Sequence, residues 1–153
     1  MNYWLMKTEP SAFSIDDLAK KSLQTEHWDG VRNYQARNML RDQMQVGDQA
    51  FFYHSSCEVP GIVGVVEIVK SAYPDPSALN PNSKYFDSRS TAENPRWFMV
   101  DVKLIKKFHH VISLKELAHI PALSNMQVLR KGNRLSIMPV TIKEWHTILD
   151  LAQ

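Results

Sequence analysis

The sequence has a single cysteine, no long apolar run and little excess of either charge, and each shortage excludes a class of protein. Cys57 alone cannot form an internal disulfide framework or a structural zinc site of several thiolates. Such cysteine usage suits a reducing compartment, the cytosol or the nucleus, and of these we predict a cytoplasmic location. No apolar run approaches the roughly 20 residues that span a bilayer, so we expect no membrane partner. Residues 1–9 lack the basic and apolar segments of a secretory signal.

Motifs for metal, nucleophile or phosphate chemistry are also missing. The six histidines form no HExxH pair and no CxxC occurs, so we expect no metal and no cofactor. His54 lies near Cys57, but a lone thiol is more often an inert small apolar residue than a nucleophile. Gly61-Ile62-Val63-Gly64 fits a GxxG pattern but enters an apolar run, where Gly64 would allow close approach of a neighbouring backbone.

What the sequence does contain is enough for one domain. Its 153 residues are 44% hydrophobic and 22% charged, which suffices for a core, and we expect a single domain over residues 1–153 and a monomer. The formal net charge of +2 permits a nucleic-acid partner without requiring one. Four tryptophans are many for this length, and tryptophan is rarely fully buried, which favours recognition by stacking.

Apolar periodicity predicts an α+β fold. Strands that follow one another in the sequence, with helices before and after them, favour this class over a doubly wound sheet. The long polar segment Pro74–Asn94 is expected to be a functional or mobile loop. We expect strands over 3–7, 50–53, 62–69, 98–104 and 135–138, helices after the capping residues Ser14, Ser113 and Thr141, and helices over 34–44 and 124–130.

The segment most informative about function is His27–Asn33. Trp28 lies outside the predicted helices and precedes the turn Asp29-Gly30, and Arg32 follows. An aromatic face beside hydrogen-bonding groups can hold a planar base by stacking and by contacts to its edge. Packing of Trp28 against the next helix explains the same residues equally well.

Three further polar clusters are weaker indicators of a site. Lys7–Pro10 ends the first strand, where pocket mouths often lie, but ordinary loop polarity explains it as well. Pro95-Arg96-Trp97 precedes a strand that Trp97 could simply cover. Arg130–Arg134, together with arginines of the predicted helix 34–44, could form a basic rim for phosphates, although charged runs are usually solvated faces.

Taken together, these segments resemble the EVE domain family, in order along nearly the whole chain. The resemblance implies a PUA-like fold, in which a strongly bent mixed β-sheet closes into a barrel flanked by helices. It also implies a pocket that binds a modified base, such as a modified cytosine or adenine, in DNA or RNA. The match is carried by Tyr3–Pro10, Trp28–Asn38, Gly47-Asp48, Phe52–Ser55, Gly61–Gly64, Asn94–Phe98 and Arg134–Val140.

Carried onto this sequence, the resemblance implies a non-enzymatic binding module whose base pocket draws on three segments. The implied pocket residues are Lys7, Thr8, Glu9, Pro10, Trp28, Asp29, Gly30, Val31, Arg32, Asn33, Tyr53, His54 and Ser55. Arg37, Arg41, Arg130 and Arg134 are expected to contact the nucleic-acid backbone. Two alternatives stay open: an ASCH-like amidohydrolase that acts on acylated cytidine with Lys7, Thr8 and Glu67, or a protein-interaction module with a vestigial pocket.

Overall fold

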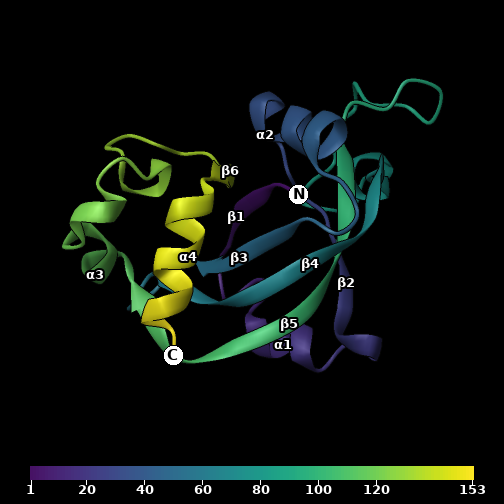
Figure 1. The fold of residues 1–153 in the computed structure, drawn as a ribbon. Coiled ribbons are helices and arrows are strands. Elements are labelled where there is room, and N and C mark those ends of the chain that lie inside the picture. The colour runs from purple at the N-terminus through teal and green to yellow at the C-terminus, as the bar shows by residue number, and fades with distance from the viewer.

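A computed structural model describes all residues 1–153, and six strands form one mixed sheet in it (Figure 1). The strands lie in the order β2-β5-β4-β3-β1-β6. β1 and β3 are parallel, and all other neighbours are antiparallel. The strands are β1 Tyr3–Thr8, β2 Thr25–Trp28, β3 Gln49–His54, β4 Gly61–Pro74, β5 Phe98–Ser113 and β6 Ile137–Val140.

The helices begin where the sequence offers capping side chains. Ser14 and Thr141 form complete capping boxes with Asp17 and Glu144, and the Ser113 hydroxyl accepts the backbone N–H of Glu116. None of the helices has the length and apolar character needed to cross a bilayer. The helices are α1 Ile15–Ala19, α2 Tyr34–Asn38, which continues into a π-turn over Met39–Gln43, α3 Leu114–Ala118 and α4 Ile142–Leu151.

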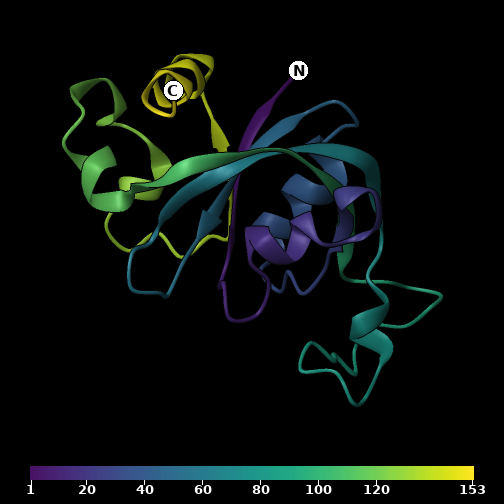
Figure 2. The ribbon, with the colours of Figure 1, turned by 90° about the horizontal axis from the view of Figure 1, so that it is seen from below.

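The sheet is strongly bent, but it does not close into a barrel. β2 and β6 lie at opposite ends of the strand order, and each pairs with one neighbour only. The bend is carried by β4 and β5, strands of 14 and 16 residues that curve together across the molecule (Figure 2). Their pairing shifts register at four places, and such irregularities bend a strand and increase its twist. The α+β class and the PUA-like architecture are confirmed, whereas the expected closure is corrected to an open sheet.

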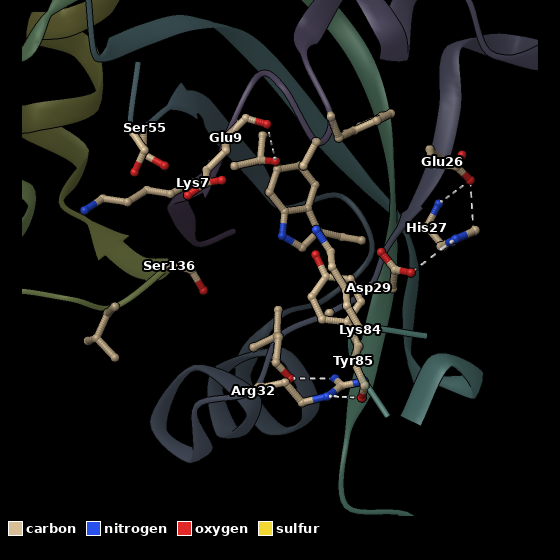
Figure 3. A pocket seen from close by; sticks show the side chains of 18 of the residues that line it. Lys7, Glu9, Glu26, His27, Asp29, Arg32, Ser55, Lys84, Tyr85 and Ser136 are labelled. Carbon is tan, nitrogen blue, oxygen red and sulfur yellow. Dashed lines mark hydrogen bonds and ion pairs between the residues drawn. The ribbon is translucent and has the colours of Figure 1, made fainter. Parts of the chain in front are cut away.

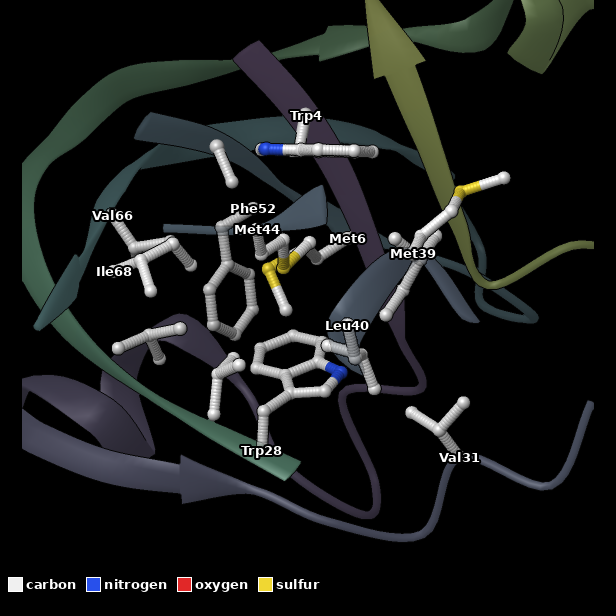
Figure 4. Packing of buried hydrophobic residues seen from close by; sticks show 14 of the residues in the cluster. Trp4, Met6, Trp28, Val31, Met39, Leu40, Met44, Phe52, Val66 and Ile68 are labelled. Atoms are coloured by element: carbon white, nitrogen blue, oxygen red, sulfur yellow. The ribbon is translucent and has the colours of Figure 1, made fainter. Parts of the chain in front are cut away.

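Two apolar clusters cover the two faces of the sheet, because successive strand residues point to opposite faces. In β3, Ala50 and Phe52 belong to a first cluster, which also takes in residues of α1, α2 and the π-turn. Phe51 and Tyr53 belong to a second cluster with residues of α3 and α4. Figure 4 shows the first cluster, in which Trp28 lies beside Phe52.

Several predicted elements differ from the observed ones. β2 was expected as a loop, and β6 runs two residues further than predicted, through Pro139. Proline is tolerated there because β6 is an edge strand, where one missing N–H faces no partner. In place of a helix over 124–130 there is only a 3-10 turn, Gln127–Leu129. Gly64 does lie against the Lys106 backbone, as expected for a glycine at a close approach.

The segment between β4 and β5, residues 75–97, projects from one end of the sheet (Figures 1 and 2). Its base is fixed at both ends. The Asp75 N–H donates to the Trp97 carbonyl at 2.9 Å, and the Trp97 indole N–H donates to the Asp87 carboxylate at 2.8 Å. The long loop predicted from composition is therefore a tethered structure that can hold side chains against the sheet.

Candidate functional site

A cavity of about 610 Å³ opens between the two edges of the bent sheet (Figure 3). One wall comes from the end of β2 and the turn after it. The other comes from the end of β1 and the segment that leads into β6. The lining residues are Lys7, Thr8, Glu9, Ala12, Phe13, Glu26, His27, Trp28, Asp29, Gly30, Val31, Arg32, Ser55, Ser56, Lys84, Tyr85, Arg134, Leu135 and Ser136. The volume is typical of a small-ligand pocket and suits one nucleotide base.

Backbone hydrogen bonds hold the β1 wall together. The Lys7 N–H donates to the Ser136 carbonyl at 2.8 Å, and the Ser55 N–H donates to the Thr8 carbonyl at 3.0 Å. Lys7 and Thr8, the last two residues of β1, both line the cavity, and the Lys7 ammonium group lies over the Tyr53 ring, 5.5 Å from its centre. Three segments far apart in the sequence, at residues 7–9, 55–56 and 134–136, thus line one space.

Trp28 is the last residue of β2 and forms the floor between cavity and core. Only 6% of its surface is exposed, and its ring stands nearly perpendicular to those of Phe13 and Phe52. Its indole N–H, unlike those of Trp4 and Trp97, makes no hydrogen bond within the protein. No buried side-chain nitrogen lacks a partner, so this N–H reaches accessible surface. Figure 4 shows the nitrogen on the ring edge directed away from Phe52.

The turn after Trp28 is fixed by a buried carboxylate. The Asp75 side chain is fully buried and accepts the Gly30 N–H at 2.9 Å, the Arg32 Nη1 at 3.1 Å and the Ser77 N–H and hydroxyl. Burial alone would raise the pKa of Asp75, but the hydrogen bonds from Ser77 and Gly30 and the charge of Arg32 outweigh it and lower that pKa below 3.8. Asp75 therefore stays ionised and holds the cavity wall in place.

Tyr85, from the projecting segment, completes the wall by lying on Gly30. A Cβ atom at Gly30 would be 2.5 Å from Cζ of the Tyr85 ring. The Arg32 Nε donates to the Tyr85 carbonyl at 2.9 Å, and the guanidinium lies 5.5 Å from the Tyr85 ring centre and 5.3 Å from that of Trp97. The Arg32 guanidinium thus donates its hydrogen bonds to groups of the protein itself, and it holds Tyr85 in place beside the cavity.

We expect Gly30→Ala to destabilise the protein and to open the aromatic wall. At φ +78°, alanine costs about 1–2 kcal/mol in backbone strain, and the new methyl group would displace the Tyr85 ring. Gly132→Ala is a matched control, because Gly132 has φ +79° with nothing within 4 Å. Thermal unfolding should show a larger loss for Gly30→Ala than for Gly132→Ala. Equal losses would contradict the proposed contact.

The charges that line the cavity are nearly balanced, with four basic and three acidic residues. Lys7 is half-buried without a carboxylate partner, and burial lowers the pKa of its ammonium group. Burial, followed by repulsion from Asp75, raises the pKa of Asp29 on the opposite wall. The cavity is thus polar, with basic and acidic side chains on both walls, and it differs in this from a pocket lined by one sign of charge.

Two of the pocket residues implied by the resemblance point elsewhere. Tyr53 is 2% exposed and belongs to the second cluster, because alternation along β3 turns it to the opposite face from Phe52. The His54 imidazole accepts the Ile15 N–H at 3.1 Å and so supports the start of α1. Neither side chain lines the cavity, whereas Ser55 beyond the strand end does.

Two more of the implied pocket residues, Asn33 and Pro10, do not line the cavity, because the local backbone structure places them elsewhere. The Asn33 side chain accepts the Ala36 N–H and caps α2. The turn after Glu9, in which the Ala12 and Phe13 N–H groups donate to the Glu9 carbonyl, brings Ala12 and Phe13 to the cavity in place of Pro10. The implied pocket is thus corrected at four positions and contains the other nine.

Of the four arginines expected to contact a nucleic-acid backbone, only Arg134 lines the cavity. Arg37 donates to the Arg96 carbonyl and lies over Tyr34, and Arg41 pairs with Asp42 at 2.8 Å, both in the region of α2. Arg130 is exposed and does not reach the cavity. Of the expected basic rim, only Arg134 is therefore at the cavity. Lys84, which was not predicted, lines the cavity as well.

Ten residues that line the cavity were not among the pocket residues expected from the sequence. Glu26 and His27 belong to the short strand β2, which ends at Trp28, and their nearness to Trp28 was an available signal. Lys84 and Tyr85 come from the projecting segment, and the approach to β6 places three residues on the opposite wall. Nothing in the local pattern of these segments indicates that they face one another. The missed residues are Ala12, Phe13, Glu26, His27, Ser56, Lys84, Tyr85, Leu135 and Ser136, with Arg134 assigned to the backbone.

The three residues expected to act in the alternative hydrolase, Lys7, Thr8 and Glu67, do not all line one cavity. Lys7 and Thr8 line the cavity, but Glu67 lies within β4, opposite Gln49 and Lys103, and does not line it. No group of three or more His, Cys, Asp or Glu side chains is placed to hold a metal ion.

The open bent sheet and its edge cavity define a PUA-like domain. The model of the EVE domain matches residues 2–151, and the chain belongs to the EVE domain family. A protein of Pseudomonas syringae of known structure is 50% identical, with a TM-score of 0.94 over 99% of both chains. Thymocyte nuclear protein 1 of Homo sapiens is 45% identical over 99% of this chain and 74% of its own length.

One solved relative contains a ligand. Human THYN1 protein was crystallised in complex with DNA that contains 5-methylcytosine. It is 44% identical, with a TM-score of 0.92 over all of this chain and 98% of its own. The names also bear on location, since relatives from chicken and human are called nuclear proteins. The predicted cytoplasmic location is therefore corrected, because one reduced cysteine fits a nuclear protein as well as a cytoplasmic one.

Proposed function

We propose that this protein binds DNA that carries a modified cytosine and holds that base in the cavity at the open edge of the sheet. The observation that supports this most strongly is the cavity itself, of base-sized volume, in a chain similar along its whole length to a protein crystallised with 5-methylcytosine DNA. RNA with a modified base remains the second possible partner. The natural ligand requires an unpaired or flipped base, because the cavity is recessed behind polar walls.

The cost of extruding a base, compared with the free energy gained by binding it, favours a base that is unpaired or weakly stacked. Unstacking and unpairing a base costs a few kcal/mol, and stacking on aromatic groups returns about 1–3 kcal/mol. Trp28 presents little of its surface, so stacking on its face alone falls short of this range. Tyr85 offers the second aromatic surface, and the Lys7, Ser55 and Ser136 groups offer polar contacts. One additional buried methyl group contributes about 0.8 kcal/mol, a roughly fourfold preference.

We propose binding without catalysis. A hydrolase needs a nucleophile within hydrogen-bond reach of a base and donors aimed at the developing oxyanion. The Thr8 hydroxyl has only the Glu9 carbonyl at 3.5 Å as a partner, and Lys7 lies over the Tyr53 ring at 5.5 Å from its centre. Incubation with N4-acetylcytidine should give no deacylation. Turnover that disappears in Lys7→Ala and Thr8→Ala would overturn this part of the proposal.

The proposed function predicts preference for one methylated base and sensitivity to salt. Fluorescence anisotropy with single-stranded and duplex oligonucleotides should show tighter binding of a central 5-methylcytosine than of cytosine, by about three- to tenfold. Affinity should fall as salt rises, because phosphate contacts at Lys84 and Arg134 release counterions. Equal affinity for methylated and unmethylated DNA would refute recognition of the methyl group, and an RNA of the same sequence tests the second partner.

A further inference from the structure

The methyl group of 5-methylcytosine does not distinguish this base from thymine. Thymine carries the same methyl group at C5, and thymine is abundant in any DNA. The two bases differ at position 4, where cytosine carries an amino donor and thymine a carbonyl acceptor. A cavity that reads only the methyl group would therefore be occupied by thymine. The protein needs an acceptor that faces position 4.

Asp29 is the carboxylate on the β2 wall of the cavity that accepts no hydrogen bond from another side chain. It follows Trp28 directly, and its side chain is 39% exposed. Its one ionic neighbour is the His27 Nε2 at 3.8 Å, which is beyond hydrogen-bond range. Figure 3 shows Asp29 on the cavity wall between His27 and Tyr85. An ionised carboxylate accepts hydrogen bonds only and has about four lone-pair sites, so it has acceptor capacity left for a donor from a ligand.

The neighbouring carboxylates are already engaged. Glu26 pairs with Lys21 at 3.0 Å and with His27 at 2.9 Å, and Asp75 is fully buried with four hydrogen bonds. Glu9 is exposed beyond the end of β1, on the other wall. Only Asp29 therefore combines partial burial, a place beside Trp28 and an unused acceptor.

We propose that Asp29 selects bases with an exocyclic amino group, and so separates 5-methylcytosine from thymine. This inference rests on the proposed function. The amino group of a bound cytosine donates to the carboxylate, whereas the thymine carbonyl would face it as a second acceptor. Partial burial strengthens the contrast, because water cannot fully solvate the carboxylate left facing a carbonyl. Burial first and the charge of Asp75 second raise the pKa of Asp29, and together they outweigh the opposing effects of His27 and of a backbone hydrogen bond.

The test compares single-stranded oligonucleotides that differ only in a central base: 5-methylcytosine, cytosine, thymine or 5-methyl-2-pyrimidinone, which lacks the amino group. We expect the wild type to bind 5-methylcytosine about 10- to 100-fold more tightly than thymine, and the pyrimidinone to bind weakly as well. In Asp29→Asn the side-chain amide can donate to the thymine carbonyl. The ratio of 5-methylcytosine to thymine affinity should then fall to within about threefold, while the ratio of 5-methylcytosine to cytosine affinity changes little.

Asp150→Asn is the matched control, because it removes the same charge at an exposed position near the end of α4. It should keep the wild-type ratio of 5-methylcytosine to thymine affinity. A wild type that prefers 5-methylcytosine to cytosine but binds thymine equally well would overturn the role of Asp29 and leave the proposed function intact. So would an Asp29→Asn variant that keeps the full ratio. A wild type with no preference among the four oligonucleotides would overturn the proposed function, and this inference with it.

Discussion

Asp75→Ala is expected to lower the free energy of unfolding by about 3–5 kcal/mol, because it leaves the Arg32 charge without its partner in a partly buried site. The Gly30 N–H loses its acceptor in the same change. The turn that carries Asp29 and the wall that carries Tyr85 both depend on these bonds, so DNA binding should be lost as well. Urea unfolding and anisotropy measure the two effects.

Asp42→Ala is the control for this loss. Asp42 also pairs with an arginine, Arg41 at 2.8 Å, but both groups are exposed, so the unfolding midpoint should hardly move. Asp75→Asn adds a test by pH. Because the pKa of Asp75 is lowered on folding, its contribution to stability is present above about pH 4 and is lost as pH falls below that value. This acid loss should be smaller in Asp75→Asn, and an unchanged acid profile would contradict the role of Asp75.

Trp28→Ala should cost about 3–5 kcal/mol of stability, since it removes a large side chain between the cavity and the first cluster. It should also abolish the preference for a methylated base. Trp28→Phe separates the two effects, because phenylalanine retains much of the packing in the first cluster but gives the cavity a smaller floor against which a methyl group can pack. We expect Trp28→Phe to remain folded, with the ratio of 5-methylcytosine to cytosine affinity reduced to within about twofold.

Trp145 provides the matched control on the opposite face of the sheet. It is 2% exposed in the second cluster, where its ring stacks on Phe51 at 4.0 Å. Trp145→Ala should destabilise the protein about as much as Trp28→Ala. Trp145→Phe should keep the full preference for methylated DNA. If both phenylalanine variants lost this preference equally, the effect would be one of general stability and Trp28 would not be part of the binding site.

The sequence predicted best those features that depend on neighbours along the chain. Ser14 and Thr141 begin their helices as expected, because a capping box is complete within four residues. The pattern of β3 identified a buried strand, in which Phe52 and Tyr53 must point to opposite faces. It could not show which of these two faces lies on the side of the cavity. That assignment depends on what packs against each face, which the strand itself does not encode.

The cavity was predicted where the family resemblance and a strand end coincided, at Lys7–Glu9 and Trp28–Arg32. It was missed where tertiary structure alone brings residues together. Tyr85 reaches the cavity because Arg32 and Gly30 hold it there, across more than 50 residues of sequence. β2 escaped prediction because its four residues, Thr-Glu-His-Trp, form a strand only by pairing with β5.

The open edge of the sheet has a mechanical consequence for ligand capture. The two walls of the cavity belong to β2 at one margin of the sheet and to the end of β1 and residues 134–136, which precede β6, at the other, and no strand pairing joins the two margins. Within the sheet, the two margins are connected through β5, β4 and β3, and the pairing of β4 with β5 contains the four register shifts. We therefore expect the width of the cavity, and with it the fit of a ligand between the two walls, to depend on the curvature of β4 and β5.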